Sequence, residues 1–368
     1  MAQVALGERP YHFAFLLIPG FSLISFAAAL EALRTANRCH TEPLFTWEVL
    51  SVDGEPVEHA GGVEMPVDDG LHDLAHRDTV LVCASFGVQK YSNKALFAWL
   101  RRQDRLGVNL GGICTASYVL ARAGLLDNHR CCIHWENLAA FREQFPELDI
   151  SPMLFEIGNR RFTSAGGTAP IDMILAIVYQ VAGRGAALAL ADRIIHTAPR
   201  DSLTQQRMPL AARIGTRHPK LTRLVEMMEA SIEEPMSVAR LAEEAEITPR
   251  QVERLFQRYL GYSPKKYYLN IRLHRARQLL LLTDRPVMDI AIACGFTTSS
   301  HFARCYRGLF GCSPLSERSL SAEASGEGVD VVKTGAPAKG KMEGLKPVLR
   351  VGEPELPEDF AEVVSVSS

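Results

Sequence analysis

Residues 237–260 read SVARLAEEAEITPRQVERLFQRYL, and residues 287–310 read VMDIAIACGFTTSSHFARCYRGLF. Each stretch predicts a short helix, a turn and a second helix that follows a hydroxyl residue, Thr248 or Thr298. Threonine is favoured there because its side-chain oxygen accepts a hydrogen bond from the first turn of the helix. One long helix, predicted over 263–283, separates the two stretches. The sequence therefore contains the same helix-turn-helix unit twice.

The doubled unit predicts DNA binding. Two units on one rigid helix can place their second helices in successive major grooves, about 34 Å apart. Arginine can bind guanine through two hydrogen bonds and glutamate can accept one from cytosine, whereas lysine and other arginines suit phosphate contacts. For the first unit and the helix after it, the expected contacts are Arg250, Gln251, Glu253, Arg254, Arg258 and Lys265. For the second unit, they are Thr298, Ser299, Ser300, His301, Arg304 and Arg307. The second set has fewer strong base readers, so we expect the first unit to carry more of the specificity.

The charge of the chain is divided along its length. In total, 40 Lys and Arg against 42 Asp and Glu give a net charge of −2, which alone favours no anionic partner. Taken in parts, the net charge is −6 over residues 1–183, +8 over 184–318 and −4 over 319–368. The positive block contains both helix-turn-helix units, which agrees with a DNA partner.

Length and composition exclude several classes of protein. The 368 residues are more than one core usually organises, so we expect two or three domains, and 47% hydrophobic residues exclude wholesale disorder. The sequence shows no apolar run of membrane-spanning length and no signal peptide, and we expect a cytoplasmic protein without membrane contact. Its eight cysteines lack metal-ligand or disulfide spacing, so we expect no bound metal and no cofactor.

The region before residue 196 alternates apolar runs with helical patterns. The predicted strands are 13–18, 45–53, 79–84, 108–111 and 131–134. The predicted helices are 26–36, 92–105, 115–125, 137–145, 170–182 and 186–195, with a hairpin-like run over 154–165. Strand–helix alternation at this spacing predicts an α/β domain with a mostly parallel sheet and helices on both faces. From residue 221 to 318 only helical signals remain, which predicts an all-α domain.

Cys114 lies where a predicted strand passes through Gly111-Gly112 into a helix. Such a turn exposes the central side chain in a strained elbow, and a helix N-terminus lowers the pKa of a thiol. His134, at the end of the next strand, could form a Cys–His pair with it. Cys114 could equally be a small residue that fills the elbow, and His134 a hydrogen-bonded histidine at a strand end.

Residues 221–318 resemble the AraC/XylS DNA-binding domain. The resemblance is carried by SVARLA (237–242), RQVERLF (250–256), RLHRARQLL (272–280), IAIACGF (290–296) and SHFARCYR (300–307). It covers the whole domain, and it implies a sequence-specific transcriptional regulator. A helical bundle with a solvated basic face is the alternative, which the doubled unit disfavours.

Residues 10–195 resemble the PfpI-like, class I glutamine-amidotransferase-like fold, which is flavodoxin-like. Together with the AraC-type domain, the chain is similar to the GlxA family of regulators, supported also by EALR (31–34), SAGGTAPID (164–172) and QRMPL (206–210). Enzymes of this fold place an acid near the end of the first strand, and the matching position here is Ser25. The incomplete constellation argues against catalysis and leaves Cys114 and His134 as vestigial candidates.

The carboxyl ends of the front strands predict a ligand site, because open α/β sheets bind ligands there. The expected ligand-binding residues are Phe86, Gly87, Cys114, Thr115, His134, Trp135 and Glu136. Phe86 and Trp135 with Glu136 could face a cationic group, and N–H groups of the helix after Cys114 could hold a carboxylate. The resemblance implies a small-molecule effector such as glycine betaine, carnitine or arginine. Ordinary core packing of Phe86 and Trp135 is the alternative.

The resulting expectation is an effector-controlled transcriptional regulator, on family grounds an activator. The expected parts are a sensing domain at 10–196 that also forms a homodimer, a linker at 197–219, a DNA-binding domain at 220–318 and a disordered tail at 319–368. The rivals are a hydrolase or amidase that uses Cys114 and His134 and carries a DNA-binding module, and an architectural DNA-binding protein without an effector.

Overall fold

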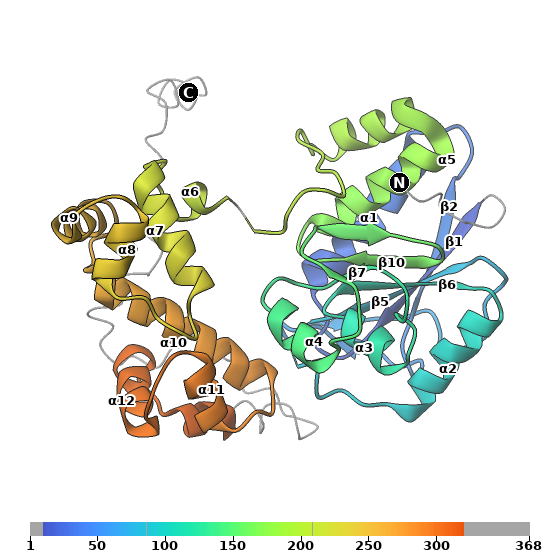
Figure 1. Cartoon of the computed structure of the whole chain (residues 1–368). Coiled ribbons are helices and arrows are strands. Elements are labelled where there is room, and N and C mark those ends of the chain that lie inside the picture. Colours follow the sequence, from blue (N-terminus) through green and yellow to red (C-terminus); the bar gives the residue numbers. More distant parts are fainter. Residues whose placement is uncertain (1–9, 86, 208, 320–368) are drawn as a thin grey trace, which may run out of the picture. The chain divides into compact units, whose positions relative to one another are not determined.

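The computed structural model describes residues 10–85, 87–207 and 209–319 (Figure 1). The chain divides into two compact units, Met1–Gln206 and Arg207–Ser368, which we call the front unit and the back unit. The tail expected to be disordered lies outside the described residues from position 320 onward.

A six-stranded sheet forms the centre of the front unit, in the order β2-β1-β5-β6-β10-β9. Its parallel strands are β2 (Phe45–Leu50), β1 (Tyr11–Leu17), β5 (Thr79–Ala84), β6 (Asn109–Cys114) and β10 (Arg161–Ser164). The edge strand β9 (Phe155–Ile157) runs antiparallel to β10. This arrangement confirms the predicted α/β class and mostly parallel sheet, and the hairpin-like run before residue 165 is the β9–β10 pair.

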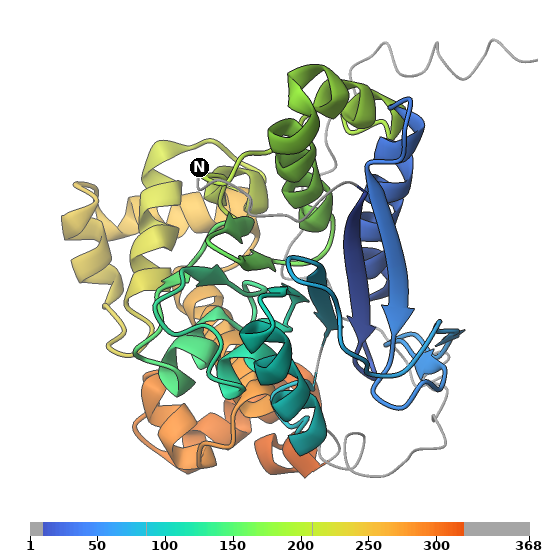
Figure 2. The same ribbon diagram turned by 90° about the vertical axis from the view of Figure 1, so that its right-hand side faces the viewer.

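The alternation of side chains along β1 produces two hydrophobic cores, one on each face of the sheet. Phe13 and Phe15 belong to the core under α1 (Leu23–Arg38) and α5 (Ala169–Arg193). Ala14 and Leu16 belong to the opposite core. The helices that contribute to that core are α2 (Lys94–Arg105), α3 (Ser117–Arg122) and α4 (Leu138–Gln144). Figure 2 shows β1 and β2 side by side with α1 packed along them.

Helix α5 is kinked at Gly183, whose φ of 83° and ψ of 175° lie outside the helical region. The two predicted helices, 170–182 and 186–195, are therefore the two halves of one kinked helix. By length and composition α5 could cross a membrane, contrary to the expectation that no run is long enough, although 33% of its most apolar window is buried inside the protein. Met173, Ile174 and Ile177 of its first half are fully buried in the front core.

The strand predicted over 131–134 is wrong in length and in place. β7 covers only Cys131–Cys132 and pairs with β8 (Ile150–Ser151) in a separate two-stranded sheet. The Cys132 N–H donates to the side-chain Oγ1 of Thr163 at 2.9 Å, so a side chain of β10 replaces a backbone partner. A second small sheet, β3 (Val57–Glu58) with β4 (Glu64–Met65), was not predicted.

The described part of the back unit is helical, as expected, with two cores joined by one long helix. Its helices are α6 (Leu210–Arg213), α7 (Pro219–Ala230), α8 (Val238–Glu244), α9 (Pro249–Leu260), α10 (Pro264–Leu282), α11 (Val287–Ala293) and α12 (Ser299–Phe310). Helix α10 contributes Tyr267 to the first core and Leu273 to the second. The pairs α8–α9 and α11–α12 are the two predicted helix-turn-helix units.

Candidate functional site

Cys114 occupies a strained elbow at the end of β6. Its φ of 64° lies in the left-handed region, which is uncommon for a residue other than glycine. Gly166, after β10, packs directly against it, because a Cβ at this glycine would lie 2.8 Å from the Cys114 Sγ. The next residue, Gly167, donates its backbone N–H to the Ser25 Oγ at 2.8 Å. The predicted elbow is thus present, and Gly166 and Gly167 pack beside it.

Hydrogen bonds tie the segments around the elbow together. The Thr115 Oγ1 donates to the Ser85 carbonyl at 2.6 Å, and the His134 N–H donates to the Cys114 carbonyl at 3.2 Å. The Ser117 Oγ donates to the Cys132 carbonyl at 2.6 Å. The segments after β5, β6 and β7 therefore meet at the carboxyl edge of the sheet.

The predicted ligand residues differ in how accessible their side chains are. His134, Trp135 and Glu136 are adjacent and half-buried, and Gly87 has open space around its Cα. Thr115 is buried and its hydroxyl is already engaged. Phe86, also predicted to bind ligand, lies outside the described residues.

The Cys114 thiol is not activated. Burial raises its pKa to about 12, and the hydrogen bond from the Thr115 N–H only partly offsets this effect. The expectation that the helix N-terminus lowers this pKa is therefore wrong. Helix α3 is short, and the N–H groups of its first turn at Tyr118 and Val119 already donate to local carbonyls, which leaves little for an anion.

The base and the acid that a catalytic cysteine needs are not arranged around Cys114 either. Burial lowers the pKa of His134, with the Glu136 carboxylate opposing the shift. No hydrogen bond joins the His134 ring to the Cys114 thiol among the described contacts; the ring lies 3.8 Å from a Glu136 oxygen instead. Ser25, at the position of the missing acid, bonds to Ser22 and Gly167 through its hydroxyl.

A buried carboxylate that the sequence reasoning missed is Asp172, in the first turn of α5. Although it is 1% exposed, it accepts hydrogen bonds from the Arg200 N–H at 2.8 Å and from the Arg200 guanidinium at 2.6 and 3.0 Å. The His196 Nε2 lies 2.8 Å from the Asp172 Oδ1, the oxygen that also accepts from the Arg200 N–H. Buried charges are retained when they are paired in this way. Asp172 thus holds the start of the predicted linker on the front unit.

Gln206 anchors the chain that follows Arg200 to the front unit a second time. Its Nε2 donates to the carbonyls of Ile133 at 2.8 Å and Met153 at 2.9 Å. Ile133 directly precedes His134. The stretch from Arg200 to Gln206, which we call the connector, therefore contacts the segment that carries the predicted ligand residues. Only the position of Gln206 in the quoted QRMPL motif could have pointed to it.

The linker predicted over 197–219 is divided between the two units. Residues up to Gln206 pack on the front unit, whereas Leu210 and Ile214 belong to a core of the back unit. Arg213 binds Glu229 of α7 through two hydrogen bonds, at 3.0 and 2.9 Å. The stretch between these two anchored parts is short and contains Met208, which lies outside the described residues.

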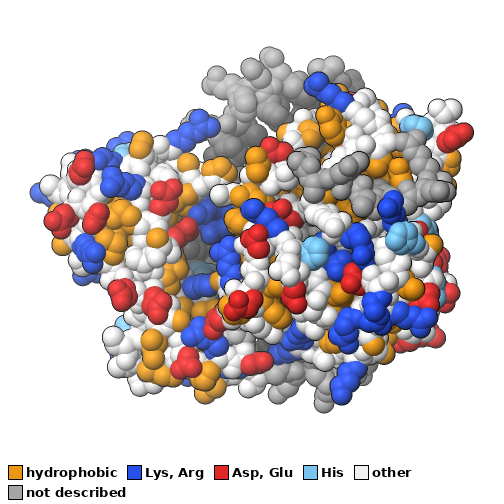
Figure 3. Space-filling view, turned by 45° about the vertical axis from the view of Figure 1, so that its right-hand side comes forward, with side chains coloured by type: hydrophobic (Ala, Val, Ile, Leu, Met, Phe, Trp, Pro, Cys, Tyr) orange, Lys and Arg blue, Asp and Glu red, His pale blue; other side chains and the backbone are white. Residues whose placement is uncertain are grey.

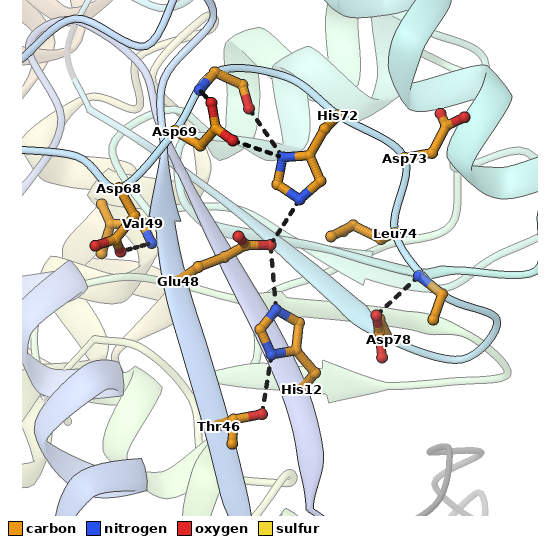
Figure 4. A network of polar contacts seen from close by, with 12 residues as sticks. His12, Thr46, Glu48, Val49, Asp68, Asp69, His72, Asp73, Leu74 and Asp78 are labelled. Carbon is orange, nitrogen blue, oxygen red and sulfur yellow. Dashed lines mark hydrogen bonds and ion pairs between the residues drawn. The ribbon is translucent and has the colours of Figure 1, made fainter.

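A second polar cluster lies on β1, β2 and the loop that precedes β5 (Figure 4). The Nε2 atoms of His12 and His72 each lie 3.2 Å from the same Glu48 oxygen, on opposite sides of it. Within the described ranges, no group of three or more His, Cys, Asp or Glu side chains could hold a metal ion. The cluster ties the loop to the sheet.

The predicted DNA contacts of the first unit are exposed on and beside α9. Arg250, Arg254 and Arg258 follow one another at helical spacing, with Glu253 beside them and Lys265 at the start of α10. Gln251 has a further role: its Oε1 accepts from the Thr248 N–H at 2.8 Å and closes a capping box at the start of α9.

The second unit exposes its predicted contacts on α12. All of them, Thr298, Ser299, Ser300, His301, Arg304 and Arg307, are exposed. Thr298 caps the helix by accepting from the His301 N–H at 3.3 Å.

Two further arginines of the basic domain are engaged inside the back unit. Arg272 donates to the carbonyls of Cys294 and Gly295 at 2.7 and 2.6 Å, and Arg277 binds Glu317. They contribute charge, but their guanidinium groups hold the second unit together.

The two units match known families separately. Residues 12–180 match the DJ-1/PfpI family, and residues 241–319 match a helix-turn-helix domain. The HTH-type transcriptional regulator GbdR of Pseudomonas aeruginosa is 43% identical over 84% of this chain and 85% of its own length. The regulator GlxA of Rhizobium meliloti is 36% identical over 87% of this chain and 99% of its own length. A solved AraC family regulator from Pseudomonas putida is 30% identical, with a TM-score of 0.46, over 50% of this chain and 100% of its own.

The similarity to the regulators extends across both units, and it agrees with an elbow that lacks an activated thiol and with helices that expose arginines. The chain therefore belongs to the family of HTH-type transcriptional regulators that combine a DJ-1/PfpI domain with an AraC-type helix-turn-helix domain, and it is a DNA-binding regulator.

Proposed function

We propose that the front unit binds a small effector at the carboxyl edge of its sheet and that this binding controls the action of the back unit on DNA. The convergence of the segments after β5, β6, β7 and β10 around Cys114 supports this proposal. Open α/β sheets bind ligands at this edge. A ligand can shift the regulator between two states only through its different affinities for them.

We infer that the front unit is a binding module and not an enzyme. A cysteine nucleophile must be a thiolate, and burial keeps the Cys114 thiol protonated at neutral pH. Known regulators are similar to the chain along most of its length. The rival hydrolase or amidase requires that Cys114→Ala abolish conversion of a metabolite by the intact protein, whereas our proposal expects no such conversion.

The proposed effector carries a cationic group. Glu136 supplies a negative charge and Trp135 an aromatic face, both half-buried beside His134. Asn137, which follows them, is fully buried, and its side-chain amide has no hydrogen-bond partner in the described part of the protein. An unpaired buried amide costs about 1–3 kcal/mol, which a ligand that reaches it would recover. Glycine betaine, carnitine and arginine belong to this class.

The connector is the proposed route from the effector to the DNA-binding unit. Gln206 binds the carbonyl of Ile133, next to the ligand residues, and Asp172 binds Arg200 from the helix that starts beside the elbow. A ligand that moves either segment changes how the connector is held, and α6 follows within a few residues.

We propose further that the twelve exposed residues of α9, α10 and α12 named above bind double-stranded DNA. The regulator would act as an activator, as a homodimer and in the cytoplasm. The basic side chains on α9 and α12 and the relatives' names as regulators support the assignment of DNA binding.

Thermal unfolding of the full chain, followed by tryptophan fluorescence, tests the effector site. All three tryptophans lie in the front unit, so the signal reports on that unit. Glycine betaine, carnitine or arginine should raise its melting temperature, because a ligand of the native state stabilises it. Glu136→Gln should remove the shift, and Glu147→Gln, exposed on the same unit, should keep it. No shift with any of the three compounds would overturn the proposed effector class.

The connector is tested separately by Gln206→Ala. We expect this variant to keep the thermal shift, while its affinity for DNA no longer responds to the ligand. A DNA response equal to that of the unchanged protein would rule out the connector route and leave the effector site intact.

A further inference from the structure

The second half of α5 has one face packed on the protein and one face uncovered. Leu190 and Ala191 are buried in the front core, together with partly buried Ala186 and Ala187. Leu188, in contrast, is 55% exposed, although the whole helix is apolar. Figure 3 shows hydrophobic side chains gathered over α5 in the upper part of the view. A single exposed leucine is common on protein surfaces, so the residues around Leu188 decide whether this face fits a partner.

The uncovered face has a regular pattern. Arg184, Gly185, Leu188, Ala189 and Asp192 are all exposed and recur at helical spacing. Gly185 and Ala189 are small, so a second helix could approach closely. Neither the Arg184 nor the Asp192 side chain forms an ion pair or a side-chain hydrogen bond within the described part of the chain.

This pattern is self-complementary. Arg184 precedes Leu188 by one helical turn, and Asp192 follows it by one turn. When two copies of this helix pack antiparallel about a two-fold axis through Leu188, each Arg184 meets the Asp192 of the other copy. Twofold homodimers use the same patch on both copies in this way. The contact between the two copies then has Leu188 at its apolar centre and one Arg184–Asp192 ion pair on each side.

We propose that this face of α5, centred on Leu188, is the surface through which two copies of the chain form a homodimer. The inference rests on the dimer in the proposed function and assigns its surface and register. The uncovered leucine supplies the apolar contact, and the two opposite charges fix the antiparallel alignment.

Sedimentation of the full chain at several concentrations tests the surface. Leu188→Asp should raise the dimer dissociation constant at least 100-fold, because it places two carboxylates at the axis. Ile24→Asp, at a residue 58% exposed on α1, is the matched control and should leave the dimer intact. Tryptophan fluorescence should show the same melting temperature for both variants at concentrations where each is monomeric.

Charge reversal tests the register without removing apolar surface. Arg184→Glu and Asp192→Arg should each weaken the dimer at least tenfold, and the double variant should restore it. A monomeric unchanged protein would overturn both the dimer and this surface. A dimer that survives Leu188→Asp would overturn the surface alone, and failure of the double variant to restore the dimer would overturn the alignment.

Discussion

The two helix-turn-helix units of the back unit are built on the same pattern of buried and capping residues, which we call the frame of each unit. Val252 and Phe256 of α9 are fully buried, and at the matching positions of α12 so are Phe302 and Tyr306. Both second helices begin after a threonine cap and end at a glycine with positive φ. The apolar pattern, the cap and the glycine therefore specify the same structure twice.

The exposed faces of the two units differ. α9 presents Arg250 and Glu253 where α12 presents Ser300 and Ala303, whereas Arg254 has a counterpart in Arg304. Exposed positions do not decide the fold, so they are free to diverge. The comparison teaches that the frame and the surface that contacts DNA are specified by separate sets of residues.

Removing the aromatic centre of the first frame should have the largest effect. Phe256→Ala leaves a cavity beside Tyr267, whose ring lies 5.4 Å away, and should destabilise the back unit by about 3–5 kcal/mol. Far-ultraviolet circular dichroism during urea unfolding would register the loss. Tryptophan fluorescence, which reports on the front unit, should not change. A common shift of both signals would contradict independent unfolding of the front and back units.

In the second frame, the residue that matches Phe256 is a tyrosine, Tyr306, whose buried hydroxyl has a polar partner. The Tyr306 hydroxyl donates to Glu317, which also accepts from Arg277 at 2.7 Å, and burial raises the pKa of Tyr306. Hydrogen bonds to charged groups contribute about 1.5–3 kcal/mol, so Tyr306→Phe should destabilise the second unit by that amount.

The reverse exchange is the control for this difference. Phe256→Tyr would bury a hydroxyl without an acidic partner and should also be destabilising, as urea unfolding can show. A Tyr306→Phe variant as stable as the unchanged protein would mean that Glu317 contributes nothing to the frame.

The exposed faces are compared by Arg254→Ala and Arg304→Ala. We expect Arg254→Ala to lose about 1–3 kcal/mol of binding at particular base pairs, and Arg304→Ala to lose less. Lys265→Ala, at a proposed phosphate contact, should weaken all DNA sequences alike and reduce the salt dependence. Binding to a set of operator variants at several salt concentrations would measure this, and a larger loss from Arg304→Ala would reverse our ranking of the two units.

Local signals were enough to predict the frames and most of the front sheet from the sequence. The threonine caps, the glycine turns and the apolar spacing all act within a few residues, so a single stretch carries them. β5 was predicted over 79–84, the bounds that the structure gives. The elbow at Cys114 followed from the glycines before it.

The contacts that the sequence did not reveal join distant residues. Asp172 meets Arg200 and Glu317 meets Arg277 only after the chain has folded. The pKa of Cys114 was predicted in the wrong direction for the same reason, because burial in the folded protein outweighs the nearby helix end. The strand predicted over 131–134 ends at Cys132, whose N–H donates to a hydroxyl of β10, a contact that no local pattern encodes.

The smallest expected effect separates capping from DNA contact at one position. Gln251 closes the capping box of α9 with its side chain, whereas His301, at the matching place in α12, takes part only through its backbone N–H. Gln251→Ala should therefore lower stability by about 0.5 kcal/mol, while His301→Ala should leave the cap unchanged. Urea unfolding and DNA binding, measured on the same variants, distinguish the two roles. If Gln251→Ala weakens DNA binding with no loss of stability, the side chain belongs to the exposed surface and not to the frame.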